Sequence, residues 1–193
     1  LKTGEKRQFS ASECQFAYRN SIFKQELKNQ YFIESITLKL TKQPTFRLNY
    51  GAIQKTLDDM NISQLSVANI SKAICLIRTQ KLPDPNIIGN AGSFFKNPEV
   101  NVDIFTNLQK KYVKMPAYHL PNKNIKIPAA WLIEQCGWKG KRKGNAGIYK
   151  NHALVLVNYG GASGKDIYDL SSDIQHSVKE KFGILLEREV NVI

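Results

Sequence analysis

Helical patterns with clear start and stop signals recur along residues 66–183 and leave few choices of architecture. The first begins after Ser66, a residue type that caps helices, and stops before Pro83 and Pro85. Its inward stripe is Val67, Ile70, Ala73, Ile74 and Ile77. Short strand-like segments separate this helix from three more. The sequence therefore predicts an α+β fold with antiparallel or mixed strand pairing.

The later helices carry equally local signals. One spans 102–112, one follows Pro128 and stops at Gly137, and one follows a capping box of Ser163 and Asp166. Strands are expected at 31–40, 152–158 and 184–192, and loops at 43–51, 116–124 and 138–147. The residues expected to face inward are Phe32, Ile36, Leu38 and Leu40 on the first strand, Ile104, Phe105, Leu108 and Tyr112 on the second helix, and Ile167, Leu170, Ile174 and Val178 on the last helix.

The change from strand and loop to alternating helices and strands falls between residues 51 and 66. We therefore expect two parts, 1–65 and 66–193. The chain begins at Leu1 and ends inside a strand-like pattern, so we expect it to be a piece of a larger protein.

A net charge of +12 favours anionic partners such as nucleic acid, anionic lipid or a phosphorylated substrate. Three widely spaced cysteines and three scattered histidines match neither a disulfide framework nor a metal site, and they indicate reduced thiols. No apolar run approaches the length of a membrane helix. We therefore expect no metal and no membrane partner.

The stretch Ile88–Pro98 joins two glycines, one serine and two phenylalanines. One interpretation is a tight turn that leads into a buried Phe94–Phe95 pair. The other is a loop that presents the Ser93 hydroxyl beside a planar or anionic ligand, because glycine lets the backbone approach a ligand closely. Periodicity does not separate these two interpretations.

Several charged residues also have two interpretations. Arg78 and Lys81 suit the negative end of the helix dipole or an anionic ligand. The basic run in 138–147 is either a solvated surface or a segment that binds phosphate groups. Glu189 shares a face with Leu185, and it is either an edge-strand charge or a functional acid.

Familiar catalytic patterns are absent from the sequence, including a P-loop, a dinucleotide-binding glycine motif and a metal-ligand cluster. The residues alone indicate a basic α+β chain that meets an anionic ligand. A basic module that binds nucleic acid or another polyanion without catalysis remains the alternative.

Taken together, five motifs extend this interpretation. The chain resembles the C-terminal portion of the bacterial UDP-N-acetylenolpyruvoylglucosamine reductase family, in the larger subtype with a tyrosine-bearing loop. The motifs occur in order over nearly the whole chain: CQFAYRNSIFK at 14–24, RTQKLPDP at 78–85, GNAGSFFKNP at 89–98, AAWLIEQCG at 129–137 and LEREV at 186–190.

The resemblance implies the end of a two-lobed FAD-binding domain, followed by a small α+β substrate-binding domain with flanking helices. It also implies an oxidoreductase of peptidoglycan-precursor synthesis. In that reaction NADPH reduces FAD, and hydride then passes to the enolpyruvyl double bond of the nucleotide sugar. Ser93 stands at the position of the proton donor. Arg19 and Glu189 stand where the substrate carboxylate is polarised and the intermediate stabilised.

The same resemblance implies further contacts. Substrate would meet Tyr50, Lys81, Asn97, Tyr118, Lys126 and His152, and FAD would meet Arg78 and Gly92. Asn20 departs from the acidic residue common at its position, and the N-terminal flavin-binding region of the family has no counterpart in these residues. We therefore expect the chain alone to be inactive and the protein to be a monomer of the bacterial cytoplasm that binds no nucleic acid.

Overall fold

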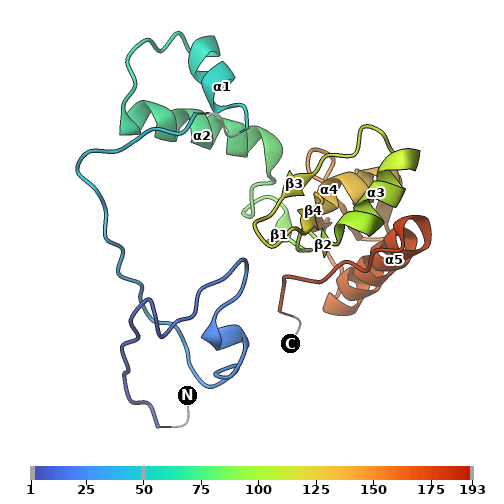
Figure 1. Ribbon diagram of the computed structural model, residues 1–193. Coiled ribbons are helices and arrows are strands. Elements are labelled where there is room, and N and C mark those ends of the chain that lie inside the picture. The colour runs from blue at the N-terminus through green and yellow to red at the C-terminus, as the bar shows by residue number, and fades with distance from the viewer. Residues whose placement is uncertain (1–2, 49–50, 192–193) are drawn as a thin grey trace. The chain divides into compact units, whose positions relative to one another are not determined.

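A computed structural model describes residues 3–48 and 51–191. The chain divides into two compact units, Leu1–Phe46 and Arg47–Ile193, and each is described by itself (Figure 1). Tyr50, an expected substrate contact, lies outside the described residues.

The first unit is mostly turns around a small aromatic cluster. Its one helical element among residues 3–46 is the 3₁₀ turn η1, Ile22–Lys24. Phe9 meets Phe23 and Tyr31 edge-on, with ring centroids 5.1 Å apart in both pairs. Cys14 is buried in the same unit.

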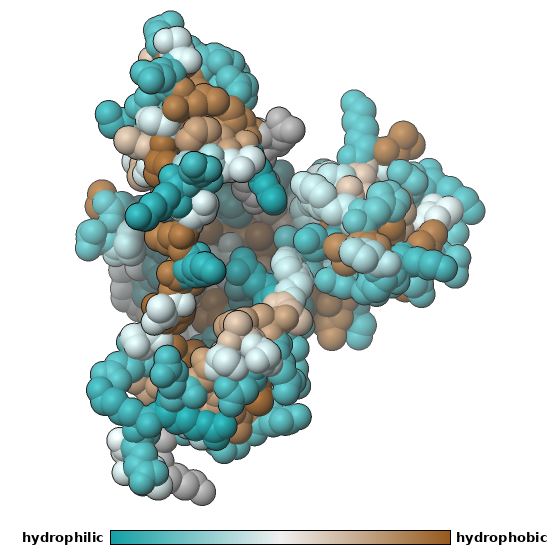
Figure 2. All heavy atoms as spheres, turned by 60° about the vertical axis from the view of Figure 1, so that its left-hand side comes forward, coloured by the Kyte–Doolittle hydropathy of each residue, from teal (hydrophilic) through white to brown (hydrophobic). Residues whose placement is uncertain are grey.

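The strand expected at 31–40 does not form, and that prediction is wrong. Phe32, Ile36, Leu38 and Leu40 are all exposed instead, with Leu40 at 82%. Figure 2 shows hydrophobic residues at the surface of the molecule. The alternating pattern is real, but a strand also needs a neighbour for its backbone hydrogen bonds. None of the described residues pairs with this segment in a ladder.

Two helices open the second unit. They are α1, Ile53–Asp59, and α2, Val67–Lys81, and they pack around Leu57 and Ala73. The Ser66 side chain accepts a hydrogen bond from the Asn69 N–H at 3.1 Å, which confirms the predicted cap. Within the expected stripe Ala73 is buried, but Val67 and Ile74 are exposed, so the stripe is narrower than predicted.

The rest of the second unit is α+β with antiparallel pairing throughout its described strands, as the sequence predicts. One sheet has the order β1-β7-β6-β5 and the other the order β2-β4-β3. Helix α5 packs against α4 and against strands β6 and β7. The elements are β1 Gly89–Ser93, β2 Glu99–Val100, α3 Val102–Lys111, β3 Tyr118–His119, β4 Ile125–Lys126, α4 Ala129–Gln135, β5 Arg142–Lys143, β6 Ala146–Ile148, β7 Val155–Asn158 and α5 Gly164–Phe182.

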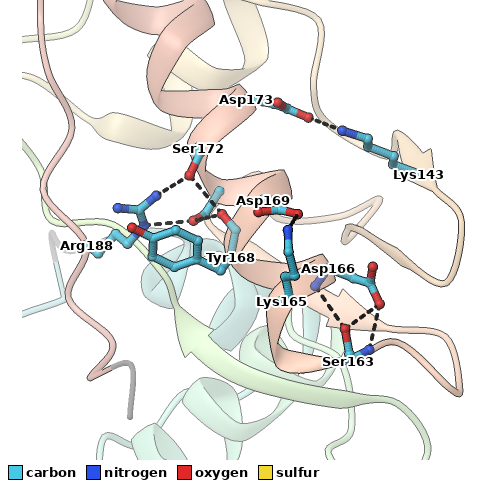
Figure 3. Close-up of polar contacts among 10 residues, drawn as sticks. Lys143, Ser163, Lys165, Asp166, Tyr168, Asp169, Ser172, Asp173 and Arg188 are labelled. Atoms are coloured by element: carbon cyan, nitrogen blue, oxygen red, sulfur yellow. Dashed lines mark hydrogen bonds and ion pairs between the residues drawn. The ribbon is translucent and has the colours of Figure 1, made fainter.

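Helices α3, α4 and α5 lie close to their predicted bounds. The capping box of Ser163 and Asp166 is present (Figure 3), and Leu170, Ile174 and Val178 face the core. Ile104 is an exception, because it is exposed rather than inward.

The short strands differ from the predictions. The expected loops at 116–124 and 138–147 contain β3 and the β5–β6 hairpin, while the strand expected at 184–192 is only a single bridge, between Phe95 and Arg188, within its described part. Strands of two or three residues are too short to show the alternation that identifies a strand in sequence.

Gly147 on β6 gives a stability prediction. A Cβ there would lie 2.7 Å from the Tyr159 ring and 2.9 Å from the Lys141 carbonyl oxygen. We expect Gly147→Ala to lower the free energy of unfolding by about 1–3 kcal/mol in urea titrations, because backbone cannot move aside cheaply. A Cβ at Gly164 meets no atom within 4 Å, so Gly164→Ala is the control and should stay within about 0.5 kcal/mol. Equal effects of the two substitutions would contradict the close approach at Gly147.

Candidate functional site

Ser93 ends strand β1 directly after a bulge. Asn90 pairs with Val157 and Ser93 with Val155, so the register shifts between these two residues of β1. Gly92 has φ of +72°, a left-handed conformation that glycine adopts without strain, and its N–H donates to Asn90 Oδ1 at 3.1 Å. Bulges redirect side chains and recur beside functional sites. The stretch expected as a turn or loop is therefore a bulged strand.

The two interpretations of this stretch turn out to be compatible. Phe94 and Phe95 are both buried, with ring centroids 5.4 Å apart, which confirms the buried pair. Ser93 itself is only half-buried, and a Cβ on Gly92 would meet no atom within 4 Å. The core thus holds Phe94 and Phe95 in place, while the space beside Gly92 is open and a planar ligand can approach the backbone there.

The C-terminal segment runs antiparallel to the residues that follow Ser93. The Lys96 N–H donates to the Glu187 carbonyl and the Glu189 N–H donates to the Phe94 carbonyl, both at 2.9 Å. The Lys96 ammonium also pairs with the Glu187 carboxylate. The structure therefore brings Glu189 opposite the residue next to Ser93, although the two are far apart in sequence.

Tyr118 and Lys126 come together on the three-stranded sheet. They pair directly across β3 and β4, and Glu99 pairs with Lys126 from the other side. Paired residues share a face of a sheet. Two expected substrate contacts are therefore neighbours, with Lys126 half-buried and Tyr118 exposed.

Asn97 has a structural role that the sequence pattern did not reveal. Its Oδ1 accepts the Ala129 N–H at 2.9 Å, so it satisfies a donor at the start of α4. Because the two residues are 32 positions apart, no local capping pattern could have indicated this bond.

Lys81 and His152 also come together. The Asn151 amide donates to the Gln80 carbonyl at 3.0 Å and ties the turn before β7 to the end of α2. Burial lowers the pKa of the half-buried His152 below its usual value, and the positive charges of Lys81 and Lys139 lower it further. The structure thus brings the His152 imidazole near Lys81 and Lys139, and Lys139 is itself paired with Glu134 at 2.8 Å.

Arg78 is exposed on the last turn of α2, and its backbone carbonyl accepts the Leu82 N–H at 2.8 Å.

In the first unit, Arg19 lies at a tight turn closed by two backbone hydrogen bonds between Ala17 and Asn20. Its φ is +53°, which costs a non-glycine residue on the order of 1 kcal/mol.

The basic run within 138–147 is held by local contacts. The Arg142 Nε donates to the Gly144 carbonyl at 2.7 Å, and its guanidinium lies 4.5 Å from the Tyr159 ring centroid. Lys143 pairs with Asp173 on α5. These contacts shape the hairpin, and they favour a structural role for the run over phosphate binding.

The lowered pKa of His152 gives a pH-dependence prediction. Between that pKa and the unfolded value of about 6.5, the unfolded chain binds more protons than the folded protein, so stability present above pH 6.5 is lost as the pH falls. His152→Asn removes the titrating group and keeps an acceptor for the Leu154 N–H. We expect the variant to lose about 0.5 kcal/mol less folding stability than the parent protein as the pH falls, a small value because the group is half-buried and screened by solvent.

Urea titrations between about pH 7 and pH 5 measure this change. The exposed His176 on α5 provides the control through His176→Asn. A pH dependence that His152→Asn leaves unchanged would contradict the assignment.

Among residues 3–48 and 51–191, no helix is both long and apolar enough to cross a membrane. The same residues contain no group of three or more histidine, cysteine or acidic side chains placed to hold a metal ion.

An antiparallel α+β domain with a serine at a strand bulge and a glutamate whose backbone lies opposite the next residue offers groups that are suited to proton transfer. The family model for the C-terminal domain of UDP-N-acetylenolpyruvoylglucosamine reductase matches residues 83–193. The chain belongs to this family, as the sequence motifs indicate.

Curated relatives carry the same family name. The reductase of Amoebophilus asiaticus is 52% identical over 193 residues, which are 100% of this chain and 57% of the relative. The reductase of Flavobacterium johnsoniae is 48% identical over 100% of this chain and 58% of its own length. That of Pseudomonas fluorescens is 44% identical over 98% of this chain and 56% of its length. The chain thus spans less than two thirds of the relatives that it matches.

Proposed function

We propose that the full-length protein containing this chain reduces UDP-N-acetylglucosamine enolpyruvate to UDP-N-acetylmuramate with NADPH and FAD. The observation that supports the proposal is the backbone hydrogen bond from Glu189 to Phe94, the residue after Ser93, within a domain of the reductase family. A hydroxyl donor and a carboxylate held on adjacent backbones are what proton delivery to a substrate carbon requires.

Ser93 is the proposed proton donor. A serine hydroxyl is a weak acid, so it delivers a proton only when it is held against a carbon that has gained negative charge. The rigid Phe94–Phe95 anchor and the bulge at Gly92 hold the serine backbone in place. Glu189 is proposed to stabilise the charged intermediate from the neighbouring segment. Arg19 remains a prediction from the family resemblance, as the group that polarises the substrate carboxylate.

The substrate is a nucleotide sugar with a pyrophosphate and a carboxylate, and the chain carries a net charge of +12. Two neighbouring pairs support anion binding: Lys126 with Tyr118, and Lys81 with His152. Lysine and tyrosine provide point charges and hydroxyl donors for such groups. Asn97 and Tyr50 stay predicted contacts, and the capping bond to α4 fixes the position from which Asn97 would act.

FAD supplies the hydride for this reaction when it is bound. A Cβ on Gly92 would meet no atom within 4 Å, so the backbone there is open to a planar ring such as a flavin, and Arg78 at the exposed end of α2 suits an anionic cofactor. Because the relatives are longer than this chain, we propose that stable FAD binding needs residues beyond these 193. The isolated chain is then expected to be colourless and inactive.

The test is product formation by the full-length protein. Purified protein, NADPH and the enolpyruvyl substrate should yield UDP-N-acetylmuramate, detected by mass spectrometry as the gain of two hydrogens. Protein that retains flavin but leaves the substrate unchanged would contradict the proposal. Tight binding of nucleic acid by a flavin-free protein would support the polyanion-binding alternative instead.

A further inference from the structure

Arg188 anchors the C-terminal segment to helix α5. Its Nε donates to Ser171 Oγ and its Nη2 to Ser172 Oγ, both at 2.7 Å. Its guanidinium carbon lies 4.3 Å from the centroid of the Tyr168 ring. Figure 3 shows Arg188 beside Tyr168 and Ser172, with dashed lines for its hydrogen bonds to the helix.

The two serines are arranged to accept hydrogen bonds. Ser171 is fully buried, and its hydroxyl donates to the Tyr168 carbonyl at 2.6 Å. Ser172 donates to the same carbonyl at 3.1 Å. Since each hydroxyl has a single proton, both oxygens are left as acceptors toward Arg188. Two adjacent acceptors match the rigid fork of a guanidinium, which a lysine ammonium does not reproduce.

The anchored residue lies between two glutamates that bond to the stretch after Ser93. Glu187 bonds to Lys96 through backbone and side chain, and the Glu189 N–H donates to the Phe94 carbonyl. The segment forms a single bridge with the continuation of β1 rather than a regular strand. The Gln175 side-chain amide also donates to the Leu186 carbonyl at 2.6 Å, and Leu186 is fully buried, so the hydrogen bonds of Arg188 act together with these contacts to fix the segment.

We propose that Arg188 is a positioning residue that holds the backbone of Glu189 in register opposite Phe94, the residue after Ser93. This inference rests on the proposed function, in which Glu189 acts on the substrate. Without these two hydrogen bonds, the segment keeps its flanking bonds, but the backbone between them, which carries Glu189, loses its link to α5. Small displacements of a reacting group lower the rate of the chemical step more than they lower binding.

The experiment is a double-mutant cycle in the full-length protein, with Arg188→Ala, Glu189→Gln and the double variant. Turnover of the enolpyruvyl substrate with NADPH is the readout. We expect Arg188→Ala to lower kcat by about tenfold to 100-fold with KM changed less than about threefold. On the Glu189→Gln background the same substitution should change kcat less than about twofold, because its effect passes through Glu189.

Two further variants keep the inference testable if Arg188→Ala does not fold. Ser172→Ala removes one acceptor of the fork, and Arg188→Lys keeps the charge without the fork. Both should lower kcat when Glu189 is present and leave it unchanged on the Glu189→Gln background. Lys165→Ala breaks an ion pair with Asp169 on the same helix (Figure 3) and is the matched control, with kcat unchanged.

Each outcome is decisive. Equal losses of kcat on both Glu189 backgrounds, or no loss at all, would overturn the positioning role while leaving the proposed function intact. Full activity of Glu189→Gln itself would remove Glu189 from the proposed mechanism, and the role of Arg188 with it.

Discussion

Ser93→Ala in the full-length protein should lower turnover of the enolpyruvyl substrate by about 10²–10⁴-fold, the usual contribution of a positioned proton donor. Reduction of the bound flavin by NADPH should proceed at the normal rate, because the serine is proposed to act only on the substrate. The substitution removes a half-buried hydroxyl at the bulge and leaves the Phe94–Phe95 anchor in place. Stopped-flow absorbance separates the two half-reactions and measures each rate.

The matched control is Ser177→Ala. This serine lies on α5, and its hydroxyl donates to the Asp173 carbonyl one helical turn away, at 2.9 Å. Its loss should leave both half-reactions within about twofold, as expected of a substitution away from the site. If Ser93→Ala slows NADPH oxidation as much as it slows substrate reduction, the serine is not the proton donor.

Phe95→Ala should destabilise the protein by about 3–5 kcal/mol, the range for truncating a buried aromatic in a packed core. The ring is 1% exposed, packs in the main core cluster and meets Phe94 edge-on. The backbone of the same residue bridges to Arg188, so the cavity would lie directly behind the candidate site. Urea unfolding followed by circular dichroism gives the free energy change.

Ile87→Ala is the control for this prediction, because Ile87 belongs to the same unit and is 85% exposed. It should change the free energy of unfolding by less than about 0.5 kcal/mol. A loss below about 1 kcal/mol for Phe95→Ala would mean that the core around β1 can collapse into the cavity, contrary to a rigid Phe94–Phe95 anchor.

The helices could be predicted because their signals are local. Ser66 caps α2 and the Ser163–Asp166 box starts α5, and each bond spans only three residues. The fold class followed from the order of these elements. The prediction of a strand at 31–40 was wrong because its signal is incomplete. Alternation shows only that the apolar side chains could share one face, whereas a strand also needs hydrogen bonds to a partner that is distant in sequence.

The candidate site shows the same division. The family motifs identify Ser93 and Glu189 as candidates, but only the folded backbone shows that Glu189 lies opposite Phe94, the residue after Ser93. The Asn97 cap and the Arg188 fork carry no local pattern, since each joins residues at least 16 positions apart. Hydrogen bonds between distant segments are a property of the fold, and local sequence patterns do not predict them.

The visible spectrum of the full-length protein tests the central claim most directly. We expect oxidised flavin bands that bleach on addition of NADPH and return when the enolpyruvyl substrate is added without oxygen. A colourless protein that takes up no FAD and ignores NADPH would contradict the claim.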